Sequence, residues 1–137
     1  MPTSIIVHER IAEWYPLLRP RLADVAGIRW VESRSADDLT GAVAGAEAAI
    51  VLINLAKRTQ WGMEGLAALG ETSADPLVLV LDPDRVPEVP DLARELGATL
   101  VWPGVVVPPR VATLLRRWLP LAAARRSPRS PLTAKDV

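Results

Sequence analysis

Short runs of branched aliphatic residues alternate with amphipathic stretches along this chain. The runs lie at 4–7, 28–31, 49–53, 77–81 and 99–102. Strand-length runs that alternate with helical patterns are typical of βαβ units, in which helices cover both faces of a parallel sheet. The run at 49–53 is apolar throughout, as expected for a central strand that is buried on both faces. The alternation therefore predicts an α/β domain with five strands.

Apolar residues spaced three and four apart predict the helices between these strands. The first helix is expected from about residue 9, but Pro16 and Pro20 fall inside its pattern and predict a kink or a later start. Ser35 is typical of the N-cap of a second helix, which Gly45 ends. The remaining helices are expected at about 63–69, 90–96 and from 109 onward.

The length of 137 residues fits one domain with its own hydrophobic core. We assign this domain to residues 1–124. Residues 125–137 are basic, are punctuated by proline and contain few large apolar side chains, a composition that predicts a disordered tail.

Charge and composition exclude several classes of function. Sixteen basic and sixteen acidic residues cancel, so the net charge attracts neither nucleic acid nor an anionic membrane. The chain has no cysteine, which excludes disulfides, thiolate metal sites and thiol nucleophiles. Its apolar runs are far shorter than the ~20 residues of a spanning helix, and no basic segment precedes a long apolar run at the start. We expect a cytoplasmic protein that binds neither nucleic acid nor membrane.

Three segments follow one another in an order that is found in a known family. Ile5–Val7 forms the first strand, Gly62–Leu66 opens the third helix, and residues 93–103 read ARELGATLVWP before an amphipathic helix at 111–119. This order resembles the bacterial response-regulator receiver domain, in which a Gly-Met-Asp-Gly-Leu segment opens helix three and a Lys-Pro pair follows strand five. The resemblance covers residues 4 to about 121. It implies a flavodoxin-like α/β/α sandwich with strand order 2-1-3-4-5 and a pocket at the carboxyl ends of the strands.

The resemblance also implies which positions should form that pocket. Receivers use an acidic pair that holds magnesium, an aspartate that accepts the phosphoryl group, a hydroxyl and a lysine. The matching positions here hold His8 and Glu9, then Asn54, then Leu81 or Asp82, and finally Trp102 followed by Pro103. Only Glu9 keeps its chemical type. No aspartate lies between residues 48 and 63, so no alignment restores the nucleophile. We predict a degenerate pocket with no catalytic residue and no cofactor.

Two residues of this pocket leave alternatives open. His8, the only histidine, is expected beside Glu9 and close to Asp82, where the three could form a metal or acid–base cluster or only a polar rim. The Lys-Pro bond of receivers is typically cis. The Trp102–Pro103 bond could therefore also be cis with the indole filling the pocket, or Trp102 could pack on helix five as an ordinary strand-end aromatic residue.

Receivers bind partners, and often dimerise, through the face formed by helix four, strand five and helix five. A receiver with an inactive pocket would keep this binding and lose the switch. We therefore predict a pseudo-receiver that is not an enzyme: a phosphorylation-independent protein-interaction module in bacterial signalling or assembly. A homodimer through the same face is an expected form. Residues expected on this face are Arg94, Arg110, Arg116, Arg117 and Trp118.

Two further expectations concern binding. Trp14, Trp30 and Trp61 are expected to be partly exposed, either as a contact surface or as individually packed indoles. The alternative function is a small-molecule or metal-binding domain, because open α/β sheets bind ligands in the crevice at the strand ends. That crevice would be lined by the residues of the degenerate pocket named above.

Overall fold

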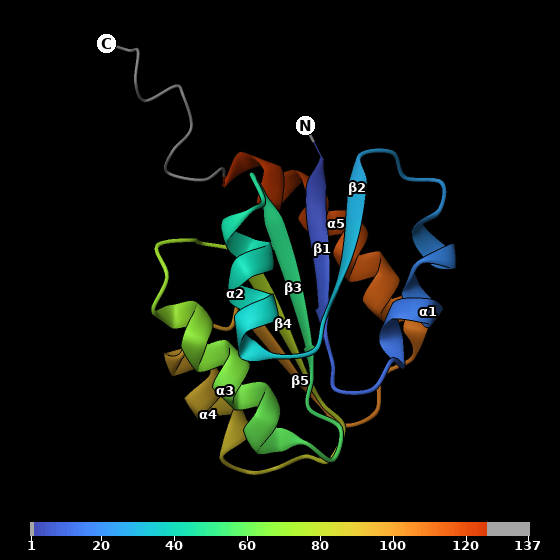
Figure 1. Cartoon of the computed structure of the whole chain (residues 1–137). Helices are drawn as coiled ribbons and strands as arrows, with labels where there is room; N and C mark the ends of the chain where they lie inside the picture. Colours follow the sequence, from blue (N-terminus) through green and yellow to red (C-terminus); the bar gives the residue numbers. More distant parts are fainter. Residues whose placement is uncertain (1, 126–137) are drawn as a thin grey trace.

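The computed structural model describes residues 2–125, which form one parallel sheet with helices on both sides (Figure 1). The strands pair in the order β2-β1-β3-β4-β5. This confirms the predicted fold class, strand order and central strand. The strands are β1 (Thr3–His8), β2 (Ile28–Ser33), β3 (Ala49–Asn54), β4 (Leu77–Asp82) and β5 (Leu100–Pro103). The predicted tail lies outside the described residues, apart from Arg125.

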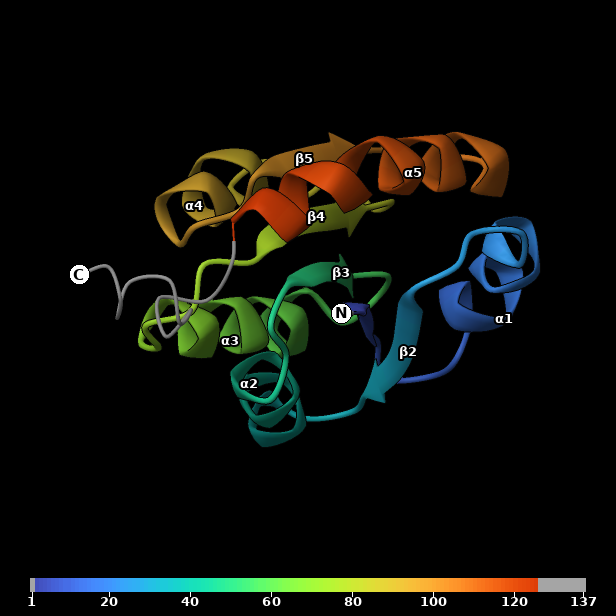
Figure 2. The same cartoon turned by 90° about the horizontal axis from the view of Figure 1, so that it is seen from above.

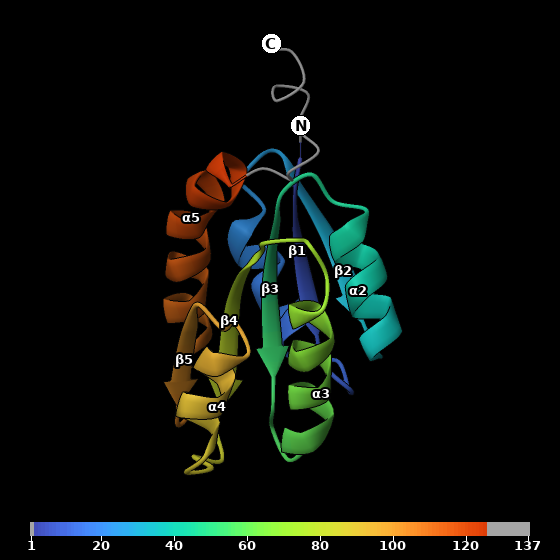
Figure 3. The same cartoon turned by 90° about the vertical axis from the view of Figure 1, so that its left-hand side faces the viewer.

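The helices lie in two layers, one on each face of the sheet. Figures 2 and 3 show α1 and α5 on one side of the sheet and α2 and α3 on the other. None of the helices within residues 2–125 is long and apolar enough to cross a bilayer. The helices are α1 (Trp14–Leu18), the short 3-10 helix η1 (Pro20–Leu22), α2 (Ala36–Ala44), α3 (Thr59–Gly70), α4 (Val89–Glu95) and α5 (Pro108–Ala124).

The first helix starts late, as its two prolines predict, and it also ends early, at Leu18. Pro16 is the third residue of α1, where the backbone N–H has no partner within the helix, so its absence costs little. Pro20 cannot donate to the preceding turn and begins η1 instead. The second helix also starts as predicted, because the Ser35 hydroxyl accepts the Asp38 N–H at 3.1 Å.

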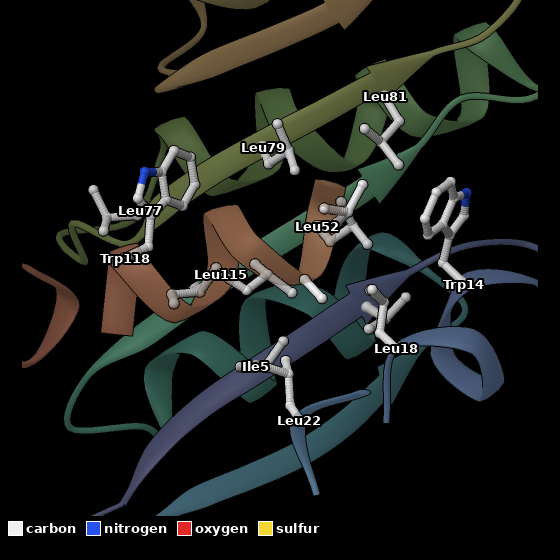
Figure 4. Packing of buried hydrophobic residues seen from close by; sticks show 14 of the residues in the cluster. Ile5, Trp14, Leu18, Leu22, Leu52, Leu77, Leu79, Leu81, Leu115 and Trp118 are labelled. Carbon is white, nitrogen blue, oxygen red and sulfur yellow. The ribbon is translucent and has the colours of Figure 1, made fainter. Parts of the chain in front are cut away.

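Two tryptophans that the sequence analysis placed at the surface are in the core. Trp118 and Trp14 are each 7 % exposed. In α5, Trp118 belongs to a stripe with Val111, Leu115 and Ala122, spaced three and four residues apart, that faces the sheet. Figure 4 shows its indole beside Leu77 of β4. The assignment of Trp118 to an interaction face is therefore wrong, and so is the expected exposure of Trp14.

Candidate functional site

The carboxyl ends of the strands meet at one edge of the sheet, the lower edge in Figures 1 and 3. Glu9 follows β1 there, and its carboxylate is buried, with 1 % of the residue exposed. It accepts the backbone N–H groups of Glu13 at 3.0 Å, Trp14 at 3.0 Å and Tyr15 at 3.1 Å. These donors would otherwise be unsatisfied at the start of α1. Glu9 therefore caps α1, with its charge at the favourable end of the helix.

Asn54, the last residue of β3, holds two glutamates together. Its Nδ2 donates to Glu9 Oε1 at 3.3 Å and to Glu13 Oε1 at 3.0 Å. Its Oδ1 accepts the N–H of Ala56 at 3.1 Å. Both amide hydrogens are thus used, and the residue is only 6 % exposed. A neutral donor stands where two carboxylates converge, so the two glutamates can approach each other without a bound cation.

His8 is fully buried, with 0 % exposure, and faces α3. Its ring stacks on Trp61, with ring centroids 4.2 Å apart and an angle of 8° between the planes. The Ser33 hydroxyl donates its hydrogen to the Ser35 carbonyl. Its oxygen therefore acts as the acceptor toward His8, and His8 Nδ1–H donates to it at 2.8 Å. His8 Nε2 has no partner among the described residues. Burial lowers the pKa of His8 from 6.5 to about 4, so the ring is neutral at physiological pH.

Asp82 ends β4 and is also fully buried. Its Oδ2 accepts the Val86 N–H at 2.9 Å, whereas Oδ1 has no partner among the described residues. Burial raises the pKa of Asp82, and the nearby Asp84 carboxylate raises it further. No group of three His, Asp or Glu side chains within residues 2–125 is placed to hold a metal ion. The metal-cluster alternative for His8, Glu9 and Asp82 is therefore wrong.

Trp102 packs on the core that α5 shares with the sheet. Alternation along β5 places Leu100 and Trp102 on the face of α1 and α5, and Val101 on the opposite face. The guanidinium of Arg110 in α5 lies 5.0 Å from the Trp102 ring centroid. Every peptide bond in the described residues is trans, including that before Pro103. The cis alternative for Trp102 is wrong, and its packing as a strand-end aromatic residue is confirmed.

A cavity of about 360 Å³ opens between the loops that follow β1 and β3. We refer to it as the strand-end cavity. Of the predicted pocket residues only Asn54 lines it, while Glu9 lies behind Asn54 and His8 is packed under α3. The sequence analysis missed three basic residues in its wall. The lining residues are Arg10, Ile11, Glu13, Asn54, Ala56, Lys57 and Arg58.

Solved structures of receiver domains share the fold of this chain. A response regulator from Thermotoga maritima superposes with a TM-score of 0.68, 9 % identity and coverage of 85 % of this chain and 97 % of that chain. A CheY-like receiver domain protein from Methanospirillum hungatei JF-1 superposes with a TM-score of 0.69 and 11 % identity, and the match covers 89 % of this chain and 98 % of that chain. A response regulator receiver domain from Rhodospirillum rubrum superposes with a TM-score of 0.61 and 20 % identity, and the match covers 88 % of this chain and 92 % of that chain. The chain has the receiver fold.

No protein-family model and no curated protein sequence matches the chain. At identities of 20 % and below, the similarity establishes the fold, and the chemistry must be argued from the strand-end residues themselves.

The four arginines predicted on the face of α4, β5 and α5 differ in what they contact. Arg94 pairs loosely with Asp91 at 3.8 Å, and Arg110 covers Trp102. Arg116 forms two hydrogen bonds with Asp24, at 2.7 and 3.2 Å, and lowers the pKa of that carboxyl. Arg116 thus ties α5 to the segment after η1. Arg117 is exposed and forms no ion pair within the described residues.

The close packing of His8 gives a testable prediction about Gly65. A Cβ at Gly65 would lie 2.5 Å from His8 Nε2, and the ring is held between Ser33 and Trp61. Gly65→Ala should lower the free energy of unfolding by about 1–2 kcal/mol, because overpacking outweighs the gain in helix propensity. Gly41→Ala in α2 is the matched control. A Cβ there meets nothing within 4 Å, so urea unfolding should show a gain of about 0.5–1 kcal/mol. Equal effects of the two substitutions would contradict the close packing.

Proposed function

We propose that this protein is a pseudo-receiver: a cytoplasmic, phosphorylation-independent module that acts in signal transduction or assembly by binding a protein, and that is not an enzyme. The observation that carries the proposal is Asn54. It occupies the end of β3, where receivers carry the aspartate that accepts a phosphoryl group, and its amide is committed to Glu9, Glu13 and Ala56. A carboxamide has neither the charge nor the nucleophilicity to form an acyl phosphate.

The contacts of Asn54 also support a constitutive state. In a receiver, magnesium and the phosphoryl group are held at this edge of the sheet. Here the Asn54 amide, rather than a cation, bridges the carboxylates of Glu9 and Glu13. Glu9 also caps α1. Because Glu9 and Asn54 are hydrogen-bonded to the residues that follow β1 and β3, these two loops need no modification to stay in place. The receiver fold then serves as a fixed scaffold for binding.

The face formed by α4, β5 and α5 is the surface that we propose for the partner. α5 contains no acidic residue, and its arginines Arg110 and Arg117 are exposed. Large apolar side chains are exposed nearby, with Leu92 44 % and Val107 58 % exposed. Basic residues beside apolar ones favour a partner that presents acidic and apolar groups, because charge complementarity steers association and apolar contact stabilises it. The same face carries exposed acidic residues on α4, Asp91 and Glu95, so a second copy that places its α4 against this α5 also meets this requirement, and a homodimer is part of the proposal.

Treatment with acetyl phosphate and Mg²⁺ tests the inactive pocket. Intact-mass spectrometry should show no gain of a phosphoryl group, and the NMR spectrum should show no change that depends on covalent transfer. A receiver domain of known activity serves as the positive control in the same buffer. A phosphorylated species that localises to the peptide containing Asn54 would overturn the proposal.

Capture of a partner from the source lysate tests the binding face. Arg117→Glu reverses the charge of an exposed side chain in α5 that forms no ion pair within residues 2–125, and it should abolish capture of the partner. Arg29→Glu, an equally exposed arginine on the edge strand β2, is the matched control and should retain it. Loss of the partner with both variants, or with neither, would contradict the proposed face.

A second candidate function, small-molecule binding, is favoured by the strand-end cavity. It does not exclude partner binding, because the cavity lies between the loops after β1 and β3 and the proposed face lies on α4, β5 and α5.

A further inference from the structure

The wall of the strand-end cavity carries three cationic side chains. Arg10 comes from the loop after β1, and Lys57 and Arg58 come from the loop after β3. All three are exposed, and none forms an ion pair with a carboxylate within residues 2–125. Arg34, Arg94, Arg116 and Arg125, by contrast, each lie beside an acidic side chain. The cavity thus gathers cations from two loops that the fold brings together, and it leaves them without a carboxylate partner among the described residues.

The carboxylates near the cavity already have donors of their own. Glu13, the only acidic residue in the wall, accepts from Asn54. Glu9 is buried and is turned to the backbone of α1. Asp84 accepts the backbone N–H of Lys57 at 2.6 Å. The cavity wall therefore presents three positive charges and one negative charge, and the negative charge is hydrogen-bonded. An anion that enters this cavity meets a net positive surface.

The loops that carry the cations are held in place. Lys57 has a φ of 55°, a left-handed conformation that costs energy in a residue with a side chain. The bond from its N–H to Asp84 and the bond from the Arg58 N–H to the Leu55 carbonyl at 2.8 Å stabilise this turn. The loop after β1 is fixed by the contacts of Glu9 and Asn54. Fixed loops reduce the ordering cost of binding.

The cavity also has an apolar wall. Ile11 is 67 % exposed, and with Ala56 it lines the same space as the cations. The volume of about 360 Å³ lies in the range of pockets for small molecules. Arginine forks and a lysine ammonium are the groups that bind phosphate most often, the first as bidentate donors and the second as a point charge. We propose that the strand-end cavity binds, without covalent transfer, a phosphate-bearing small molecule whose apolar part lies against Ile11.

NMR titration at low ionic strength with inorganic phosphate, pyrophosphate and phenyl phosphate tests this site. Each probe should give saturable shifts of the amides of Ala56, Lys57 and Arg58. Arg58→Gln and Arg10→Gln should each weaken pyrophosphate binding about tenfold, the expected effect of losing a charge-assisted hydrogen bond. Arg94→Gln removes a similarly exposed charge on α4 and should leave the affinity unchanged.

Ile11→Ser tests the apolar wall separately. It should weaken the binding of phenyl phosphate several-fold and leave inorganic phosphate unaffected, because only the first probe has an apolar part. Shifts that persist unchanged in Arg10→Gln and Arg58→Gln would overturn the site. A phosphoserine peptide that bound more tightly than phenyl phosphate would overturn its assignment to a small molecule. Neither outcome bears on the acetyl phosphate test, so failure of this site and failure of the pseudo-receiver proposal are distinguishable.

Discussion

Replacing Asn54 with aspartate is expected to lower the free energy of unfolding by about 3 kcal/mol in the absence of divalent cations. The substitution removes the Nδ2 donor that lies 3.3 Å from Glu9 and 3.0 Å from Glu13 and puts a third carboxylate in its place. Three carboxylates that converge at a largely buried position repel one another. Because hard oxygen ligands are those that Mg²⁺ prefers, millimolar Mg²⁺ should restore much of the stability of this variant. Urea unfolding with and without Mg²⁺ measures both effects.

Asn54→Ala separates the lost hydrogen bonds from the added charge. It removes the same donor without a new carboxylate, so it should cost about 1–2 kcal/mol and show no response to Mg²⁺. The wild-type protein should show no response either. If Asn54→Asp is as stable as the wild type in a chelating buffer, Glu9 and Glu13 do not depend on the Asn54 amide for their close approach, and Asn54 does not hold the pocket together.

The strands and their order could be predicted from the sequence because both depend on simple patterns. Runs such as 49–53 are apolar throughout, and the receiver-like segments around Gly62 and Trp102 occur in a consistent order. The helix positions were also predicted well where a cap is local, as at Ser35, whose partner Asp38 is three residues away. The cap of α1 was not predicted. Glu9 accepts from N–H groups four to six residues further along, across a turn whose shape depends on the packing of Trp14.

The site was predicted less well because strand geometry separates residues that are neighbours in sequence. Side chains alternate between the two faces of a sheet, so His8 lies under α3 while Glu9, just beyond the strand, turns to α1. Trp102 turns to α5 for the same reason. Trp118 is a different case, because its spacing from Val111 and Leu115 already placed it on the buried stripe of α5.

Arg10, Lys57 and Arg58 carried a signal that the sequence analysis did not use. Each lies within four residues of the end of β1 or β3, at the carboxyl edge of the sheet. The strand order places β1 beside β3, so the two loops are neighbours although more than 40 residues separate them. A search for charged residues at these positions, with the strand order in hand, would have found the cationic wall. It would not have shown that the nearby carboxylates are already hydrogen-bonded.

Acidification from pH 8 to pH 5 is expected to remove about 2 kcal/mol of stability through His8 alone. The pKa of His8 is about 4 in the folded protein and 6.5 in the unfolded chain. Between these values the unfolded chain binds more protons, so the contribution of His8 is complete above pH 6.5 and is lost as the pH falls toward 4. Protonation would put a charge on a fully buried ring whose Nε2 has no acceptor within residues 2–125 and is packed closely against Gly65.

The titration itself can be measured without ambiguity because His8 is the only histidine. The imidazole Cε1–H resonance in the folded protein should shift with a midpoint near pH 4. A midpoint near 6.5 would mean that the ring is accessible to water, and it would contradict the stacking on Trp61 and the close contact with Gly65.

A second buried group, Asp82, also has a different pKa in the folded protein and in the unfolded chain, so the effect on stability requires a control. Asp38 favours the charged form of His8, which opposes the effect of burial. Asp82 has a raised pKa in the folded protein, so its contribution to stability increases as the pH falls, opposite in sign to that of His8.

His8→Asn is the control variant, because it keeps an N–H donor near the position of Nδ1 for Ser33 and removes the titrating ring. The loss of stability on acidification should therefore be about 2 kcal/mol smaller in His8→Asn than in the wild type. Equal losses would assign the pH dependence to the carboxylates, and the neutral, buried state of His8 would then have no measurable share in the stability of the fold.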